Sequence, residues 1–458
     1  MLRLKRLLFL APAGFALAGV LSQVPARADQ PAPRGIALPA PDPLAHSLSV
    51  VAMLGRKMFY DPALSGSGRM SCASCHDPAN HFAPDNARAV QIGGAHLASP
   101  GIRAVPSLTY RIFTPAFTFG PPNPSEELNE ASPMAVSQQG AAAKGVTTVA
   151  GPATTAKPLK TAGTTTLAAP VPRGGLFWDG RADTLEDQTF GVLMSPFEMA
   201  NTSRAALAAT IRARYGKRLA MLFGKGVMTD DDLIISEAGF ALGRYQREDP
   251  AFHPFSSKFD AVLAGKATFT PAEAAGKKLF DDPKKGNCAA CHLDSSETPG
   301  VPPLFTDFEY EALGVPRNPA IPANADPGYH DLGLCGPLRD DAIARNPANC
   351  GLFKTPSLRN VASRKVFFHN GVYHDLKQVV DFYVKRDTDP AAIYPMRNGK
   401  LNRYDDLPKR YRGNIDYLDA PFGLATLGQK PALTPAEEDD IVAFLKTLTD
   451  GYTPAKTQ

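Results

Sequence analysis

Two pentapeptides of the form C-x-x-C-H hold the residues best suited to chemistry; they run from Cys72 to His76 and from Cys288 to His292. In this spacing two thiols can add to the two vinyl groups of a haem, and the adjacent imidazole can bind its iron. A zinc site or disulfide bonds are the alternatives for either copy. Two copies in one chain predict two covalent c-type haems. The residues that hold them would be Cys72, Cys75 and His76 for the first haem, and Cys288, Cys291 and His292 for the second.

The first 28 residues predict export from the cytoplasm. Arg3, Lys5 and Arg6 precede an apolar run at residues 7–21, and residues 26–28 read Ala-Arg-Ala, which is typical of a signal peptide and its cleavage site. The run is too short to span a bilayer, and no later segment has about 18 uninterrupted apolar residues. We therefore expect a signal peptide at 1–28, a mature chain without a membrane span, and a periplasmic location, where bacteria attach haem to C-x-x-C-H.

Charge gives no sign of a nucleic-acid partner. The chain has 49 basic and 45 acidic side chains, and four of the basic ones but none of the acidic ones lie in the predicted signal peptide, which leaves a mature balance of 45 against 45. A neutral balance does not indicate a phosphate-binding surface. Of the six cysteines, Cys335 and Cys350 lie outside the two motifs. In an oxidising compartment this pair predicts a disulfide bond, with two free thiols as the alternative.

The chain repeats the elements that must position these motifs. G-R-K-M-F-Y-D-P at 55–62 and G-K-K-L-F-D-D-P at 276–283 each precede one motif, and both read as the end of an amphipathic helix. Capping boxes at Thr270 and Thr434 predict two helix starts, and residues 204–223 and 230–247 have helical spacing. We expect a mainly α fold of two cytochrome-c-like helical domains, 29–264 and 265–458, each with one covalent c-type haem.

Residues 131–172 have a different composition. They are rich in Ala, Thr, Gly and Pro and contain neither an acid nor an aromatic residue. Such a segment buries too little apolar surface to offset its ordering entropy, so we expect a low-complexity insertion in the first domain. A regulatory lid is the alternative.

With these motifs in place, the chain resembles the bacterial di-haem cytochrome c peroxidase and MauG family. The resemblance rests on both C-x-x-C-H motifs and on four further segments: Phe177-Trp178-Asp179-Gly180-Arg181, Glu198-Met199, Leu358-Arg359-Asn360-Val361 and Phe368-His369-Asn370-Gly371. It implies a periplasmic peroxidase that reduces hydrogen peroxide to water with electrons from a small donor, a cytochrome c or a cupredoxin. The alternatives are MauG-like oxidation of side chains in a partner protein and a non-catalytic di-haem electron-transfer cytochrome. A homodimer is compatible with the sequence, which does not set the oligomeric state.

The same resemblance implies roles for four residues. Trp178 would lie between the two haems and carry electronic coupling, and Arg181 would meet a haem propionate. Glu198 and Gln188 would stand over the peroxidatic haem, where a carboxyl group can take a proton from peroxide and return it to the departing oxygen. Each residue also has an ordinary structural explanation: a core tryptophan, a surface ion pair, or a glutamate favoured at a helix start.

Tyr383 is the predicted sixth ligand of the second iron. It follows three apolar residues at helical spacing, which places it on the inward face of a helix. A buried core tyrosine would fit equally well, but the resemblance implies an axial ligand here, with Met396 as the competitor. A phenolate would stabilise the higher oxidation states of iron and lower the reduction potential.

Two further assignments stay open at this level. His96 is the positional candidate for a distal ligand of the first iron, and a surface-loop histidine is the alternative. The family's calcium site between the haems uses an asparagine where this chain has Ala104, and its backbone ligands would fall at Arg364 and Val366. Calcium is therefore a doubtful cofactor.

Overall fold

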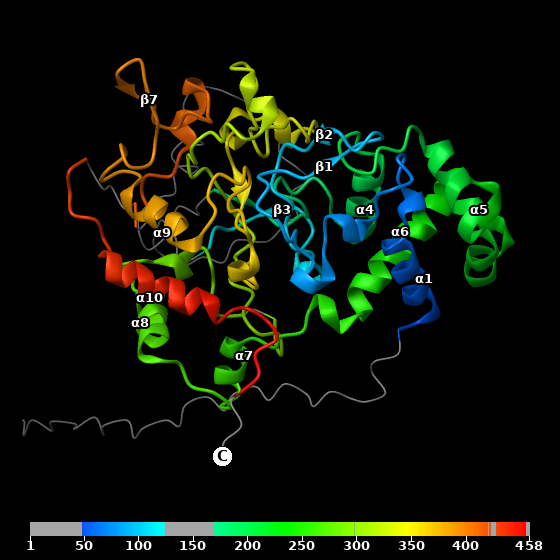
Figure 1. The fold of residues 1–458 in the computed structure, drawn as a ribbon, viewed down its shortest axis with the longest axis horizontal. Helices are drawn as coiled ribbons and strands as arrows, with labels where there is room; N and C mark the ends of the chain where they lie inside the picture. Colours follow the sequence, from blue (N-terminus) through cyan, green and yellow to red (C-terminus); the bar gives the residue numbers. More distant parts are fainter. Residues whose placement is uncertain (1–47, 124–168, 297, 420, 423–426, 455–458) are drawn as a thin grey trace, which may run out of the picture.

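The computed structural model describes residues 48–123, 169–296, 298–419, 421–422 and 427–454 (Figure 1). The predicted signal peptide and all but the last few residues of the predicted insertion lie outside these ranges. The α-helices of the described chain are α1 (Val50–Phe59), α4 (Leu185–Met194), α5 (Arg204–Phe223), α6 (Asp231–Glu248), α7 (Lys258–Leu263), α8 (Pro271–Asp281), α9 (Leu376–Lys385) and α10 (Pro435–Lys446).

Strands are short and occur as antiparallel pairs. The pairs are β1 (Ile92–Gly93) with β2 (Ser99–Pro100), β3 (Thr118–Gly120) with β4 (Val171–Arg173), β5 (Tyr310–Glu311) with β6 (Phe353–Lys354), and β7 (Met396–Arg397) with β8 (Lys400–Leu401). The predicted mainly α fold is therefore confirmed, and so are the predicted helices at 204–223 and 230–247. Strand β4 begins at Val171, so the end of the predicted insertion is a strand.

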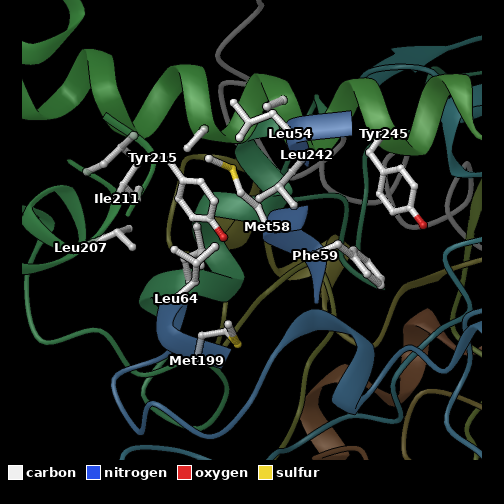
Figure 2. Packing of buried hydrophobic residues seen from close by; sticks show 14 of the residues in the cluster. Leu54, Met58, Phe59, Leu64, Met199, Leu207, Ile211, Tyr215, Leu242 and Tyr245 are labelled. Carbon is white, nitrogen blue, oxygen red and sulfur yellow. The ribbon is translucent and has the colours of Figure 1, made fainter. Parts of the chain in front are cut away.

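A first hydrophobic core lies among α1, α5 and α6. Leu54 and Met58, one helical turn apart on α1, are buried with Leu242 of α6 and Tyr215 of α5 (Figure 2). Helix α1 begins at Val50 because the hydroxyl of Ser49 accepts a hydrogen bond from the Ala52 amide. The i, i+4 spacing of the apolar residues turns one face of α1 toward α6.

Gly55 permits the close crossing of α1 and α6. A Cβ at this position would collide with the carbonyl oxygen of Ala241 on α6. Alanine normally stabilises a helix relative to glycine, but here the collision should make the substitution destabilising. We expect Gly55→Ala to lower the free energy of unfolding by about 1–3 kcal/mol, the usual cost of overpacking, in a denaturant titration.

Gly226→Ala is the matched control, because a Cβ at Gly226 has no heavy atom within 4 Å. A Gly55→Ala protein as stable as the Gly226→Ala protein would show that the two helices separate without cost.

A second core lies among α8, α9 and α10, and α8 and α10 lie side by side (Figure 1). Both predicted capping boxes are present, at Thr270 before α8 and at Thr434 before α10. Gly276 repeats the role of Gly55, since a Cβ there would collide with the Asp440 carbonyl of α10. Phe259 of α7 is buried in this second core, although the predicted boundary at residue 264 assigns it to the first domain.

Candidate active site

Each C-x-x-C-H motif lines its own cavity. Cys72, Cys75 and His76, which begin at the 3₁₀ turn η2 (Cys72–Ser74), line the first cleft. The second motif begins at the 3₁₀ turn η7 (Cys288–Ala290), and its two thiols and His292 line the second cleft. None of these four cysteines is in a disulfide bond. Two thiols and an imidazole facing one cavity are the donor set that a covalent haem requires, so both clefts fit that group.

The two histidines are oriented alike. The Nδ1 atom of His76 lies 3.0 Å from the carbonyl oxygen of Phe82, and Nδ1 of His292 lies 3.0 Å from that of Phe305. Burial lowers the pKa of each imidazole to about 4, so both rings are neutral at pH 7. A carbonyl that accepts from Nδ1–H leaves Nε2 free to bind a metal, and it also holds the ring in place.

The carbonyl supports belong to a repeat that sequence reasoning missed. Phe82 and Phe305 have positive φ angles of 53° and 56°. Each carbonyl also accepts the backbone amide of a leucine, Leu108 in the first cleft and Leu358 in the second. Both leucines end a Pro-Ser-Leu triplet, at residues 106–108 and 356–358. The repeated triplet was the available signal for these two walls.

Gln188 and Glu198 line the first cleft with His76. Gln188 is buried on α4, and Glu198 follows α4 in a turn closed by hydrogen bonds to the Ser195 carbonyl. Burial raises the pKa of the Glu198 carboxyl above its ordinary value, and the positive charge of Arg181 lowers it part of the way back. A carboxyl group with a raised pKa inside a cavity is suited to proton transfer.

Arg181 lines the first cleft and also forms an ion pair. Its guanidinium lies 2.8 Å from Asp179 and stacks on the Phe177 ring at 3.6 Å. Asp179 pairs a second time with Arg103, at 2.7 Å, and Arg103 contacts Asp331 at 2.6 Å. Burial alone would raise the pKa of Asp179, but its two arginine partners outweigh that effect and hold the pKa below its ordinary value.

Trp178 lines both clefts. Its Nε1 atom donates a 2.8 Å hydrogen bond to the Ala104 carbonyl, and its own carbonyl accepts the amide of Lys354 at 3.0 Å. Pro106 also lines both cavities. The indole is therefore part of the wall that the two clefts share.

Tyr383 on α9 lines the second cleft with His292. Its ring stacks on Phe422, with centroids 5.6 Å apart, and burial raises the pKa of its phenol. Met396, the competing ligand, is 60% exposed on β7 and is not among the residues that line this cavity. Of the two candidates, Tyr383 alone lines the cavity that also contains His292.

His96 lies in the exposed turn between β1 and β2, outside the lining of the first cleft. The amide of Leu97 bonds the carbonyl of Gly94, which closes this turn. This position agrees with the alternative given by the sequence, a histidine in a surface loop.

Two carbonyl groups beside the doubtful calcium position already accept hydrogen bonds. The Ala104 carbonyl already accepts from Trp178, and the Val105 carbonyl accepts from Nη1 of Arg364 at 3.2 Å. A guanidinium in contact with this segment repels a divalent cation.

Comparison with known proteins agrees with this geometry. Residues 50–268 match the family model described as di-haem cytochrome c peroxidase. The methylamine utilization protein MauG of Paracoccus denitrificans is 34% identical over 412 residues, which cover 87% of this chain and 88% of MauG. The chain belongs to the di-haem cytochrome c peroxidase and MauG family.

Two further relatives of this peroxidase family member are similar over most of its length. The diheme peroxidase BthA from Burkholderia thailandensis has 38% sequence identity to this chain. Its crystal structure matches with a TM-score of 0.70, and the match covers 90% of this chain and 87% of BthA. The cytochrome c551 peroxidase of Nitrosomonas europaea is 26% identical over 333 residues, 72% of each chain. The protein is thus an oxidoreductase of the peroxidase type with the di-haem peroxidase fold.

Other features of this peroxidase bear on its surroundings. Cys335 and Cys350 form the predicted disulfide bond. Within the ranges that the structure describes, no helix is both long enough and apolar enough to cross a membrane.

Proposed function

We propose that this protein is a periplasmic di-haem peroxidase that reduces hydrogen peroxide to water with electrons from a small redox protein. The reaction consumes one peroxide, two protons and two electrons and releases two waters. The observation that carries the proposal is the half-buried Glu198 carboxyl, with Gln188, in the cleft of His76. A cytochrome that only carries electrons has no use for a proton-transferring acid in that cavity.

The side chains of the first cleft divide the work. Haem, when bound, supplies the iron that takes up peroxide and exchanges electrons. Glu198 accepts the first proton of peroxide and returns it to the outer oxygen, which leaves as water when the O–O bond breaks. The Gln188 amide can donate a hydrogen bond to peroxide and orient it. The pKa of His76, lowered to about 4, keeps its ring neutral and therefore able to ligate.

The wall between the clefts and the second cleft complete the proposal. Trp178, shared by both cavities, provides the through-protein contact for electrons moving between them. Tyr383 would help His292 to hold the second haem as a further ligand of its iron, and Arg181 would contact a propionate of the first haem. His96 lies at the surface and is left out of the proposed ligand set.

Export and domain organisation belong to the same proposal. The predicted signal peptide at 1–28 and the Cys335–Cys350 disulfide both favour the periplasm, an oxidising compartment. The two hydrophobic cores support one cytochrome-c-like unit around each haem, with α7 assigned to the second.

The direct test is peroxide turnover by the protein carrying both haems. A reduced mono-haem cytochrome c or a reduced cupredoxin serves as the donor, and donor oxidation and peroxide loss are followed together. We expect two donor molecules to be oxidised for each peroxide consumed. The proposal would be overturned if peroxide persisted both with the reduced cytochrome c and with the reduced cupredoxin.

Tyr383 favours a second candidate function, MauG-like oxidation of side chains in a partner protein. A phenolate ligand suits storage of oxidising equivalents better than collection of electrons. Mixing the diferric protein with peroxide in a stopped-flow spectrometer separates the two candidates. A spectral change without prior reduction favours side-chain oxidation, whereas inertness until one haem is reduced favours the ordinary peroxidase.

A further inference from the structure

Three cationic side chains line the second cleft near Trp178 without a carboxylate partner. They come from the 3₁₀ turn η4 (Arg111–Phe113), from β6 and from the end of the 3₁₀ turn η11 (Val361–Ser363), and they are Arg111, Lys354 and Arg364. Their side chains donate only to backbone carbonyls, those of Ser107, Gly175 and Val105 respectively. Among the described residues, no carboxylate lies within ion-pair distance of any of the three.

Buried arginines elsewhere in the described chain do have carboxylate partners. Arg111 and Arg364 are half-buried, and the fully buried arginines of the described chain each contact a carboxylate. These pairs are Arg103 with Asp331 at 2.6 Å, Arg339 with Asp341 at 2.8 Å, Arg359 with Asp260 at 2.6 Å and Arg386 with Asp387 at 2.6 Å. Lys354 is only 4% exposed, and the acid that acts on it, Asp179, is already paired with Arg103 and Arg181. A buried charge without a counterion is unfavourable, so the missing anion is to be sought in the cavity.

The charge of Arg111 also disfavours the charged forms of Lys354 and Arg364. Burial lowers the pKa of Arg111 to about 10, and burial together with the charge of Arg111 lowers that of Arg364 to about 10. The pKa of Lys354 falls well below its ordinary value for the same two reasons. Both arginines also act on His76 across the shared wall, so their positive charge reaches both clefts.

The chemistry of the proposed cofactor identifies the anion. A haem held by two thioethers carries its two propionates on the edge opposite the sulfur atoms. We propose that Arg111, Lys354 and Arg364 form a carboxylate-binding cluster that holds the propionate edge of the second haem against the wall shared with the first cleft. This inference rests on the proposed two-haem function. The cluster supplies from the protein the positive charge that a bound divalent cation would otherwise bring to this wall.

The test measures the reduction potential of the second haem, not turnover. A cation beside the propionates favours the reduced haem, which carries one more negative charge. Arg364→Met and Lys354→Met should therefore each shift that potential to more negative values, and Arg364→Lys should restore most of the shift. The readout is a spectroelectrochemical titration of the intact protein, after mass measurement has shown that both haems are attached.

Arg218→Met is the matched control, since Arg218 is an exposed arginine on α5. We expect the second haem of the Arg218→Met variant to have the reduction potential of the wild type. We also expect the calcium chelator EGTA to leave the wild-type potential unchanged. Potentials of the Arg364 and Lys354 variants equal to that of the Arg218 variant would overturn the cluster, as would a shift on adding EGTA.

The variants leave both thioether cysteines and His292 unchanged, and the mass measurement checks that the haem is still attached. Arg111→Gln gives an independent third measurement if one of the other variants folds poorly. The outcome is also separable from the proposed function. Unshifted potentials in a protein that still turns over peroxide refute the cluster alone, and shifted potentials in a protein without turnover refute the peroxidase assignment alone.

Discussion

Replacing Glu198 with glutamine is expected to lower the rate of peroxide reduction by about 10²- to 10⁴-fold, the usual contribution of one acid–base group. Glutamine keeps the size of the side chain and its place in the first cleft, but it can neither accept nor return a proton. Both haems should stay attached, because Cys72, Cys75 and His76 are untouched. The measurement is steady-state peroxide consumption, with attachment checked by protein mass.

The role of Glu198 as a base also predicts how the rate of peroxide reduction depends on pH. Burial raises the pKa of Glu198 above the ordinary value, and only the carboxylate can act as the base. The rate should therefore fall as the pH drops through a value above that of an exposed glutamate, and this acid limb should vanish in Glu198→Gln. The control is Glu237→Gln on α6, because burial also raises the pKa of Glu237 but it lies outside the lining of the cleft. Equal rates for the two variants would remove Glu198 from the mechanism.

Local chemistry explains what the sequence could predict. The haem motifs can be recognised in the sequence because two thiols and one imidazole must reach one macrocycle from within five residues. Helices α8 and α10 were predictable because Thr270 and Thr434 satisfy backbone amides through their own side chains. Tyr383 was predictable only as an inward-facing residue. Helical spacing does not distinguish a core tyrosine from one that faces an iron.

Contacts between distant segments explain what the sequence could not predict. The carbonyl groups beside His76 and His292 belong to Phe82 and Phe305, which have a left-handed conformation that aromatic residues seldom adopt, and no local pattern predicts it. Arg111 and Lys354 belong to segments far apart in the chain, and neither lies in a motif. Their unmatched charge becomes visible only when the fold brings them to one cavity. His96 was placed by counting residues, and a closed surface turn carries it away from the cleft.

Replacing Tyr383 with phenylalanine is expected to change the ferric absorption spectrum of one haem only and to raise the reduction potential of that haem. A phenolate donates negative charge to ferric iron, so its loss destabilises the oxidised state relative to the reduced state. Axial ligands move haem potentials over a range of about 0.8 V, so the rise should be on the order of tenths of a volt. Phenylalanine keeps the ring that stacks on Phe422, which limits the structural effect of the substitution.

Tyr373→Phe provides the matched control. Tyr373 is a neighbouring tyrosine whose phenol pKa is also raised by burial, but it does not line the second cleft. Its loss should leave both the spectrum and the potential unchanged. Because burial keeps the free phenol of Tyr383 protonated, its ionisation at neutral pH requires the charge of the iron. A Tyr383→Phe protein with the spectrum of the wild type would mean that the iron bound by His292 has a different sixth ligand, and the argument from a phenolate to stored oxidising equivalents would then fail with it.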